Sequence, residues 1–221
     1  MARPRRKAGP GSRSRLLAAA TAEFAARGYD GVSVERIARR AHLNKAMVYY
    51  HFGSKEGLYR EMLREIFRAV GTRMREIVDA PARPAEKLQR LVAAFAQEIS
   101  QRPQFPPIMM REMVEHGAHL DAESIRLLLV IPLTFAEVLG EGVAAGSFRP
   151  VDPMLAYFSV LGPVAMLTAS GPMRAAAAAK IGLDLPTPDE SQLIEHLQHL
   201  ALAMLNAGPD GTGPAGSGAH A

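Results

Sequence analysis

The 221-residue sequence contains no cysteine, and this absence removes several classes of protein. Without cysteine there is no disulfide framework, no thiolate metal site and no cysteine nucleophile, and a reducing cytoplasm is the natural setting. The first thirty residues hold no signal-peptide core, because the basic start at Arg3 leads into Gly-Pro-Gly-Ser. No apolar run is expected to approach the length of a membrane span. We therefore expect a soluble cytoplasmic protein without a membrane partner.

Catalytic motifs are also missing. The sequence has no Gly-x-Ser-x-Gly elbow, no phosphate-binding glycine loop and almost no strand pattern to carry either one. With 48% hydrophobic residues, the chain can still build one or two small domains with a real core. We predict a folded protein that is not an enzyme and has no cofactor.

Charge is divided unevenly along the chain. Up to Arg75 there are 17 Lys and Arg against 6 Asp and Glu, whereas the remainder has 9 against 16. A basic segment attached to an acidic body suits an anionic polymer as partner, because clustered cations release counterions when they meet phosphates. Composition alone is equally compatible with an ordinary solvated surface.

Helical signals fill the first part of the chain. An apolar stripe from Leu16 ends at Gly28, a natural stop, and Ser33 is a good cap for a second helix. A short third helix is expected to open at Asn44, and Ser54 can cap a long fourth one. Four helices therefore fit within about the first 76 residues.

The remainder also has helical periodicity. Further helices are expected near 88–99, 105–116, 121–145, 153–167 and 188–205. Pro132 is expected to kink or break the third of these, since proline removes a helical donor and clashes with the preceding turn. Thr187 and Glu190 have the spacing of a capping box for the last one. The fold class is all-α, with about nine helices.

The short third helix presents polar and aromatic side chains outward. With Val48 directed inward at about 100° per residue, Tyr49 and Tyr50 point away from the core. A helix pair joined by Ala41-His42-Leu43, whose second helix has such a face, has the character of a helix-turn-helix that enters the major groove. Side chains within reach of phosphates would then be Tyr49, His51 and Lys55.

The segments Val32–Ala41 and Val48–Leu58 resemble the DNA-binding signature of the tetracycline-repressor (TetR) family of bacterial transcriptional regulators. An Ile-Ala pair followed at this spacing by Tyr-x-x-Phe-x-x-Lys-x-x-Leu carries the resemblance, which runs from about Arg15 to Leu63. It implies a homodimer that binds a near-palindromic operator. It also implies release of the operator when a small molecule enters the C-terminal domain.

The resemblance also assigns roles to single residues. It places Ser33, Tyr49, His51 and Lys55 on phosphates, and Lys45, Ala46, Met47 and Tyr50 facing the bases; Asn44, at the start of the recognition helix, is a further DNA-binding candidate. His42 stands where glycine is usual and must accept a less favourable backbone angle. Met47 stands where threonine is frequent and offers only an apolar contact, so the operator sequence cannot be inferred. Tyr49 as scaffold, Met47 as core and Lys55 as a plain surface charge remain alternatives.

The sequence says less about a site for the effector than about the DNA-binding helices. Candidates to line an apolar cavity are Phe95, Phe105, Ile108, Met109, Met110, Met113 and Phe158, although an ordinary core position is the more common explanation for any one of them. Two groups at helical spacing raise the possibility of a metal site: Glu112, Glu115, His116 and His119, and the pair His196 and His199. Charged helix surfaces often produce that pattern, so no metal site is predicted.

These observations lead to one division of the chain and one function. We expect a disordered basic arm at 1–11, the helix-turn-helix domain at 12–53, a ligand-binding and dimerisation domain at 54–207 and a disordered tail at 208–221. The helices near 153–167 and 188–205 are apolar over more than one face and are expected to form the dimer interface. The predicted function is a repressor released from its operator by a small apolar molecule. The alternative is an architectural or metal-responsive DNA-binding protein without an organic inducer.

Overall fold

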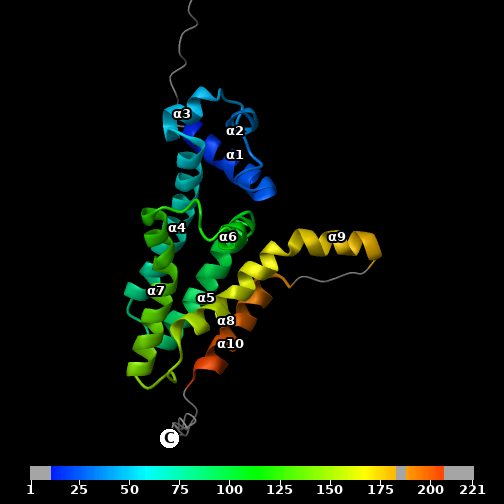
Figure 1. Cartoon of the computed structure of the whole chain (residues 1–221). Coiled ribbons are helices and arrows are strands. Elements are labelled where there is room, and N and C mark those ends of the chain that lie inside the picture. Colours follow the sequence, from blue (N-terminus) through cyan, green and yellow to red (C-terminus); the bar gives the residue numbers. More distant parts are fainter. Residues whose placement is uncertain (1–10, 183–187, 207–221) are drawn as a thin grey trace, which may run out of the picture. The chain divides into compact units, whose positions relative to one another are not determined.

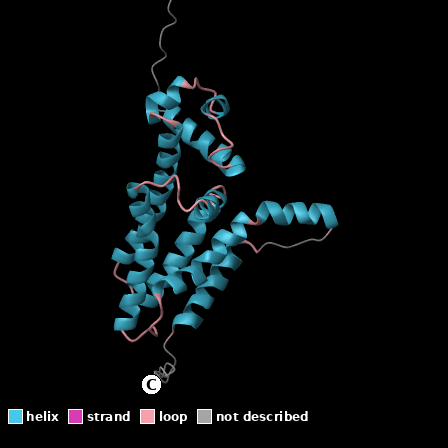
Figure 2. Ribbon diagram, viewed as in Figure 1, coloured by secondary structure: helices cyan, strands magenta, loops and turns pink. Residues whose placement is uncertain are grey.

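The computed structural model of the chain describes residues 11–182 and 188–206, and these residues form ten α-helices (Figure 1). The helices are α1 (Gly11–Arg27), α2 (Val34–Arg40), α3 (Ala46–Phe52), α4 (Lys55–Asp79), α5 (Pro84–Ser100), α6 (Phe105–Val114), α7 (Ala122–Ala144), α8 (Pro153–Ala169), α9 (Gly171–Ile181) and α10 (Glu190–Leu205). Within the same residues there is no strand (Figure 2), and one isolated antiparallel bridge joins Phe148 to Asn206. The predicted all-α class is confirmed.

The helices form two compact units that alternate along the chain. The first contains the described residues up to Ala69 together with Arg102–Leu128, and the second contains Val70–Gln101 and the described residues from Leu129 onward. In the first unit, α1 packs against α2, α3 and α6. In the second, α5, α8 and α10 lie side by side and pack on one another (Figure 1).

Local signals in the sequence set most helix ends. Gly28 has a φ of 74° and ends α1, as predicted for a left-handed C-terminal glycine. The Ser33 Oγ accepts a hydrogen bond from the Arg36 amide at 3.2 Å, and the Ser54 Oγ accepts one from the Gly57 amide at 2.9 Å. These two caps satisfy amides that have no partner within the helix.

The expected effect of Pro132 is partly wrong. α7 continues through this proline from Ala122 to Ala144, so the helix is not broken. The same stretch buries Ile131, Phe135 and Val138 almost completely. Burial of three large side chains at about 1.5–3 kcal/mol each outweighs the roughly 3 kcal/mol cost of an interior proline.

The last two helices also differ from expectation. The capping box of α10 is Asp189 with Gln192 rather than Thr187 with Glu190. A carboxylate is a good cap and also gains from the positive end of the helix dipole, which favours Asp189 over a hydroxyl; Thr187 lies outside the described residues. α9 was not predicted, because its alanine run has no apolar stripe and it buries no side chain.

The expectation that no apolar run approaches the length of a membrane span is also wrong. By length and composition α7 could span a membrane, with a mean hydropathy of 1.8, and so could α8 and α9 together as a pair bent by 49°. Core helices of soluble proteins meet the same test. Phe135 and Val138 of α7 have no exposed surface, and 33% of its apolar window is buried.

Two glycines on α7 provide a matched test of packing in the second unit. A Cβ atom at Gly142 would clash with the buried Phe148 ring, whereas one at Gly140 would meet nothing. We expect Gly142→Ala to lower the free energy of unfolding by about 1–3 kcal/mol. Gly140→Ala should raise it by up to about 1 kcal/mol, because alanine favours helix. Urea denaturation followed by circular dichroism measures both, and equal responses would contradict the packing of Phe148 on α7.

Candidate DNA-binding interface

The first three helices form a small core that orients α3. Leu16 and Phe24 of α1, Ile37 of α2 and Val48 of α3 are almost completely buried. Val48 is the single buried side chain of α3, as its spacing predicted. The other side chains of this helix are therefore available to solvent or to a partner.

A buried carboxylate fixes α2 on α1. Glu23 is buried, and its carboxylate accepts hydrogen bonds from Arg36 at 2.6 Å and from Arg40 at 3.1 Å. Burial by itself would raise the pKa of Glu23, but the hydrogen bonds from these two arginines hold it below its ordinary value. Sequence reasoning missed this residue, because Glu23 has the appearance of a surface charge on α1.

The turn between α2 and α3 depends on a strained residue. His42 has a φ of 52°, so the less favourable angle predicted for the residue in the glycine position is confirmed. The Leu43 amide donates to the Ala38 carbonyl at 2.8 Å across this turn. The Arg15 guanidinium donates to the Ala41 carbonyl at 2.5 Å and so ties the end of α2 to α1. These contacts offset the cost of the left-handed angle.

The recognition helix presents a polar and aromatic surface. Tyr49 is 51% exposed and Tyr50 is 75% exposed, so their outward direction is confirmed. The Asn44 side chain accepts a hydrogen bond from the Ala46 amide at 3.0 Å, in the turn just before α3. Lys45 pairs with Glu35 of α2 at 3.1 Å, and both side chains remain exposed. Met47 is half-buried and Ala46 is exposed.

Three of the four residues predicted to contact phosphates, Ser33, His51 and Lys55, already have partners within the first unit. The His51 Nε2 and the Ser12 Oγ are hydrogen-bonded at 2.8 Å. The Lys55 ammonium lies 4.1 Å from the centroid of the Tyr29 ring, as a cation–π contact. Ser33 is exposed and caps α2. Their roles toward DNA stay predictions, and Arg3, Arg5, Arg6 and Lys7 of the basic arm lie outside the described residues.

The residues predicted to bind an effector fall in both units. In the first unit, Phe105 and Met109 are buried on α6, while Met113 is exposed. In the second, Phe95 is buried on α5, while Phe158 of α8 is 54% exposed. Their role in ligand binding stays a prediction.

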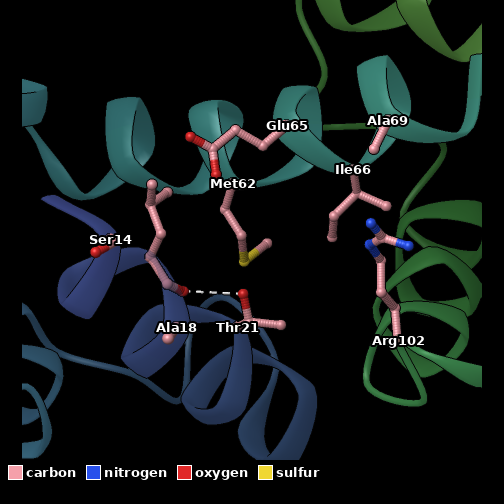
Figure 3. A pocket seen from close by; sticks show the side chains of 9 residues that line it. Ser14, Ala18, Thr21, Met62, Glu65, Ile66, Ala69 and Arg102 are labelled. Carbon is pink, nitrogen blue, oxygen red and sulfur yellow. Dashed lines mark hydrogen bonds between the residues drawn. The ribbon is translucent and has the colours of Figure 1, made fainter. Parts of the chain in front are cut away.

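A partly open cavity of about 520 Å³ lies between α1 and α4 in the first unit (Figure 3). It is lined by Ser14, Leu17, Ala18, Thr21, Met62, Glu65, Ile66, Ala69 and Arg102. None of the predicted effector residues lines it. Two polar side chains that line the cavity already have partners: Thr21 donates to the Leu17 carbonyl at 2.9 Å, and Glu65 pairs with Arg13. The cavity is therefore mainly an apolar groove between two packed helices.

Two family models match consecutive parts of the chain. Residues 16–62 match the model of bacterial regulatory proteins of the tetR family, and residues 84–198 match a tetracyclin repressor-like C-terminal domain. The first match contains α2, α3 and their turn, and the second runs from α5 into α10.

Individual relatives agree with these matches. The chain is 32% identical over 163 residues to the HTH-type transcriptional repressor KstR2 of Mycobacterium tuberculosis, a match that covers 66% of this chain and 74% of the relative. The HTH-type transcriptional repressor NicS of Pseudomonas putida is 29% identical over 141 residues, which covers 63% of this chain and 61% of NicS.

Solved structures extend the similarity over most of the fold. The ketosteroid transcriptional regulator KstR2 of Mycobacterium tuberculosis has a TM-score of 0.68 at 26% identity, covering 90% of this chain and 97% of KstR2. The fatty acid degradation regulator FadR from Bacillus halodurans has a TM-score of 0.70 at 21% identity, covering 89% and 97%. At that identity FadR supports the fold alone.

The contacts of Glu23 predict a pH-dependent contribution to stability. We expect Glu23→Gln to lower the free energy of unfolding by about 1–3 kcal/mol at neutral pH, since half-exposed arginines weaken the pairing. Because the pKa is lowered in the folded state, this contribution is present above the ordinary glutamate pKa and is lost as the pH falls through the lowered value. The difference from wild type should therefore shrink below about pH 4.

The matched control for this prediction is Glu76→Gln. Glu76 is exposed on α4 and lies 3.9 Å from the Arg73 guanidinium. Its replacement should change the free energy of unfolding by less than about 0.5 kcal/mol at any pH. Denaturation curves at several pH values would contradict the role of Glu23 if the two variants behaved alike.

Proposed function

Because the chain belongs to the tetR family of bacterial regulatory proteins, we propose that it is a repressor that leaves a near-palindromic operator when a small apolar molecule binds. It is a helix-turn-helix transcriptional regulator and not an enzyme. Beyond membership of the family, we propose that the protein represses transcription, that it forms a homodimer and that its effector is a small apolar molecule. Both KstR2 and NicS are named as repressors, which supports the first of these.

The exposed surface of α3 is the main support for sequence-specific DNA binding. This helix buries only Val48 and holds Tyr49 and Tyr50 outward, and it follows a turn fixed by backbone hydrogen bonds. Lys45, just before the helix, is also exposed. Both tyrosines leave half or more of their surface exposed. A helix held in this way is suited to the major groove, where residues near its start reach base edges and its flanks reach phosphates.

The proposed homodimer is supported by apolar residues on the outside of the second unit. On α8, Leu155 is 69% exposed and Phe158 is more than half exposed, and on α10 Leu200 is also exposed. These two helices already pack on each other, and each also has buried residues, Ala156 and Val160 on α8 and Leu197 on α10. The exposed side chains fit burial against the same two helices of a second copy, in a four-helix interface.

The proposed effector is a small apolar molecule. The name of KstR2, a ketosteroid transcriptional regulator at 26–32% identity, supports this class. Within the first unit, Phe105 supplies buried aromatic surface and Met109 supplies an adaptable side chain, while Phe95 is a separate candidate in the second unit. For release, the effector must bind the DNA-incompetent form better than the DNA-competent form.

Operator binding is tested by competition. The full-length protein is mixed with a labelled duplex from the DNA upstream of its own gene, and unlabelled specific or random duplex of equal length is added. We expect the specific competitor to be effective at a concentration at least about 1,000-fold lower. A ketosteroid is then added as effector probe. Equal competition by the two duplexes would favour an architectural protein and overturn the proposal.

Variants separate base reading from phosphate binding. Tyr50→Ala and Lys45→Ala should change the preference among operator sequences, because these side chains are expected to face the bases. Lys55→Ala should weaken binding to all sequences about equally and make the salt slope shallower by about one unit. Lys180→Ala removes the same charge from an exposed position on α9 and should change neither quantity.

The dimer is tested on α8. We expect Leu155→Glu to produce a monomer at micromolar concentration, because a charge would be buried in an apolar interface. Thr72→Glu provides the control charge at an exposed polar position on α4, outside the proposed interface. Light scattering measures the mass of each variant. A monomeric wild-type protein, or a dimeric Leu155→Glu variant, would contradict this interface.

A further inference from the structure

We propose that Glu112, Glu115 and His119 form a binding site for a divalent transition-metal ion of the zinc type. One ligand atom from each residue lies within 4.8 Å of the other two. The His119 Nδ1 lies 3.0 Å from the Glu112 Oε1 and 3.4 Å from the Glu115 Oε2. Donors bound at about 2.1 Å around a tetrahedral zinc ion lie roughly 3.4 Å apart, a separation that the two His119 distances already approach.

Neither carboxylate of the group has an ion pair with an arginine or lysine within the described residues. Glu112 is 1% exposed, and its partner within the group is the His119 imidazole, which is charged only when protonated. The Arg111 guanidinium is directed at the carbonyls of Phe24 and Ala25. A buried carboxylate without a neutralising partner is costly, and a dication would remove that cost.

A second observation points to a missing ligand. The Glu112 Oε2 is buried and has no hydrogen-bond partner among the described residues, although the Oε1 of the same carboxylate accepts two hydrogen bonds. Buried carboxylate oxygens are normally satisfied. A metal ion bound by Glu112 would give this oxygen a partner through bidentate or adjacent coordination.

The group is held by side chains around it. The Tyr59 hydroxyl donates to the Glu112 Oε1 at 2.6 Å, and the Tyr29 ring lies 4.0 Å from the His119 ring between centroids. Burial, followed by the hydrogen bond to Glu112, raises the pKa of Tyr59, so its hydroxyl stays a donor. Such neighbours fix the orientation of metal ligands and strengthen binding.

The chain reverses after α6 to bring His119 back to Glu112. His116 and Gly117 both have positive φ angles, 57° and 71°, and the Gly117 amide donates to the Glu112 carbonyl at 2.7 Å. His116 itself is exposed and does not belong to the group. One imidazole with two carboxylates suits zinc and its neighbours better than magnesium or calcium, which prefer oxygen ligands alone.

Three protein ligands leave a fourth position open for water or for an oxygen of another molecule. The site would also join the last turn of α6 to Tyr59 of α4 and, through the Tyr29 ring, to the segment after α1. All of these elements belong to the first unit, which contains the helix-turn-helix. Metal binding is therefore expected to stabilise that unit.

The experiment uses the full-length protein after EDTA treatment and dialysis, without DNA, so that its result is independent of operator binding. Titration calorimetry with ZnCl2 should show one ion per chain at micromolar metal, and the Tm should rise. MgCl2 should give neither effect. A wild-type protein that binds no zinc, or that binds magnesium equally well, would show that the group is a hydrogen-bond network and overturn the proposal.

Variants locate the bound ion. His119→Gln and Glu115→Gln should abolish zinc binding, and Tyr59→Phe should weaken it about 10–100-fold. His116→Asn is the matched control, because asparagine tolerates the positive φ and leaves the three ligands intact. Circular dichroism checks folding; Glu115 is exposed, so its variant remains informative if His119→Gln fails to fold. Zinc binding that persists in both glutamine variants would place the ion elsewhere, for example on His196 and His199, and refute the site.

Discussion

The buried carboxylate of Glu23 holds the DNA-binding surface in place. Its hydrogen bonds to Arg36 and Arg40 fix both ends of α2 on α1, and the turn at His42 then positions α3 from the end of α2. α2 has only seven residues and α3 has seven, which is too short for either helix to be stable alone. Their orientation therefore comes from tertiary contacts, of which this charged one is the most directional.

Periodic and capping signals made much of the fold predictable. The buried stripe of α4, with Leu58, Met62, Ile66 and Val70, follows directly from its sequence, as do the caps at Ser33 and Ser54. The outward direction of Tyr49 and Tyr50 followed from helical geometry. These features were predictable because each depends on residues within one or two turns of the chain.

Other features depend on residues that only the fold brings together. Glu23 meets arginines 13 and 17 residues away, and Tyr59 meets Glu112 across 53 residues. The approach of His119 to Glu112 requires a positive φ at His116, which no composition rule indicates. α9 has no apolar stripe in its sequence, because none of its side chains is buried. The candidate DNA face was therefore easier to predict than the contacts that support it.

α6 contains residues predicted to bind the effector and also contacts two helices of the first unit. Its adjacent residues Arg111 and Glu112 contact different helices: Arg111 donates to two carbonyls near the end of α1, and Glu112 accepts from Tyr59 of α4. Gly28, which ends α1, lies beside the Arg111 side chain. A displacement of α6 would break hydrogen bonds to both helices at once, and the buried groups left behind would lack partners. A ligand that moves α6 must therefore bind the displaced form more tightly than the undisplaced form. The difference between its two binding free energies must at least equal the free energy lost with those hydrogen bonds.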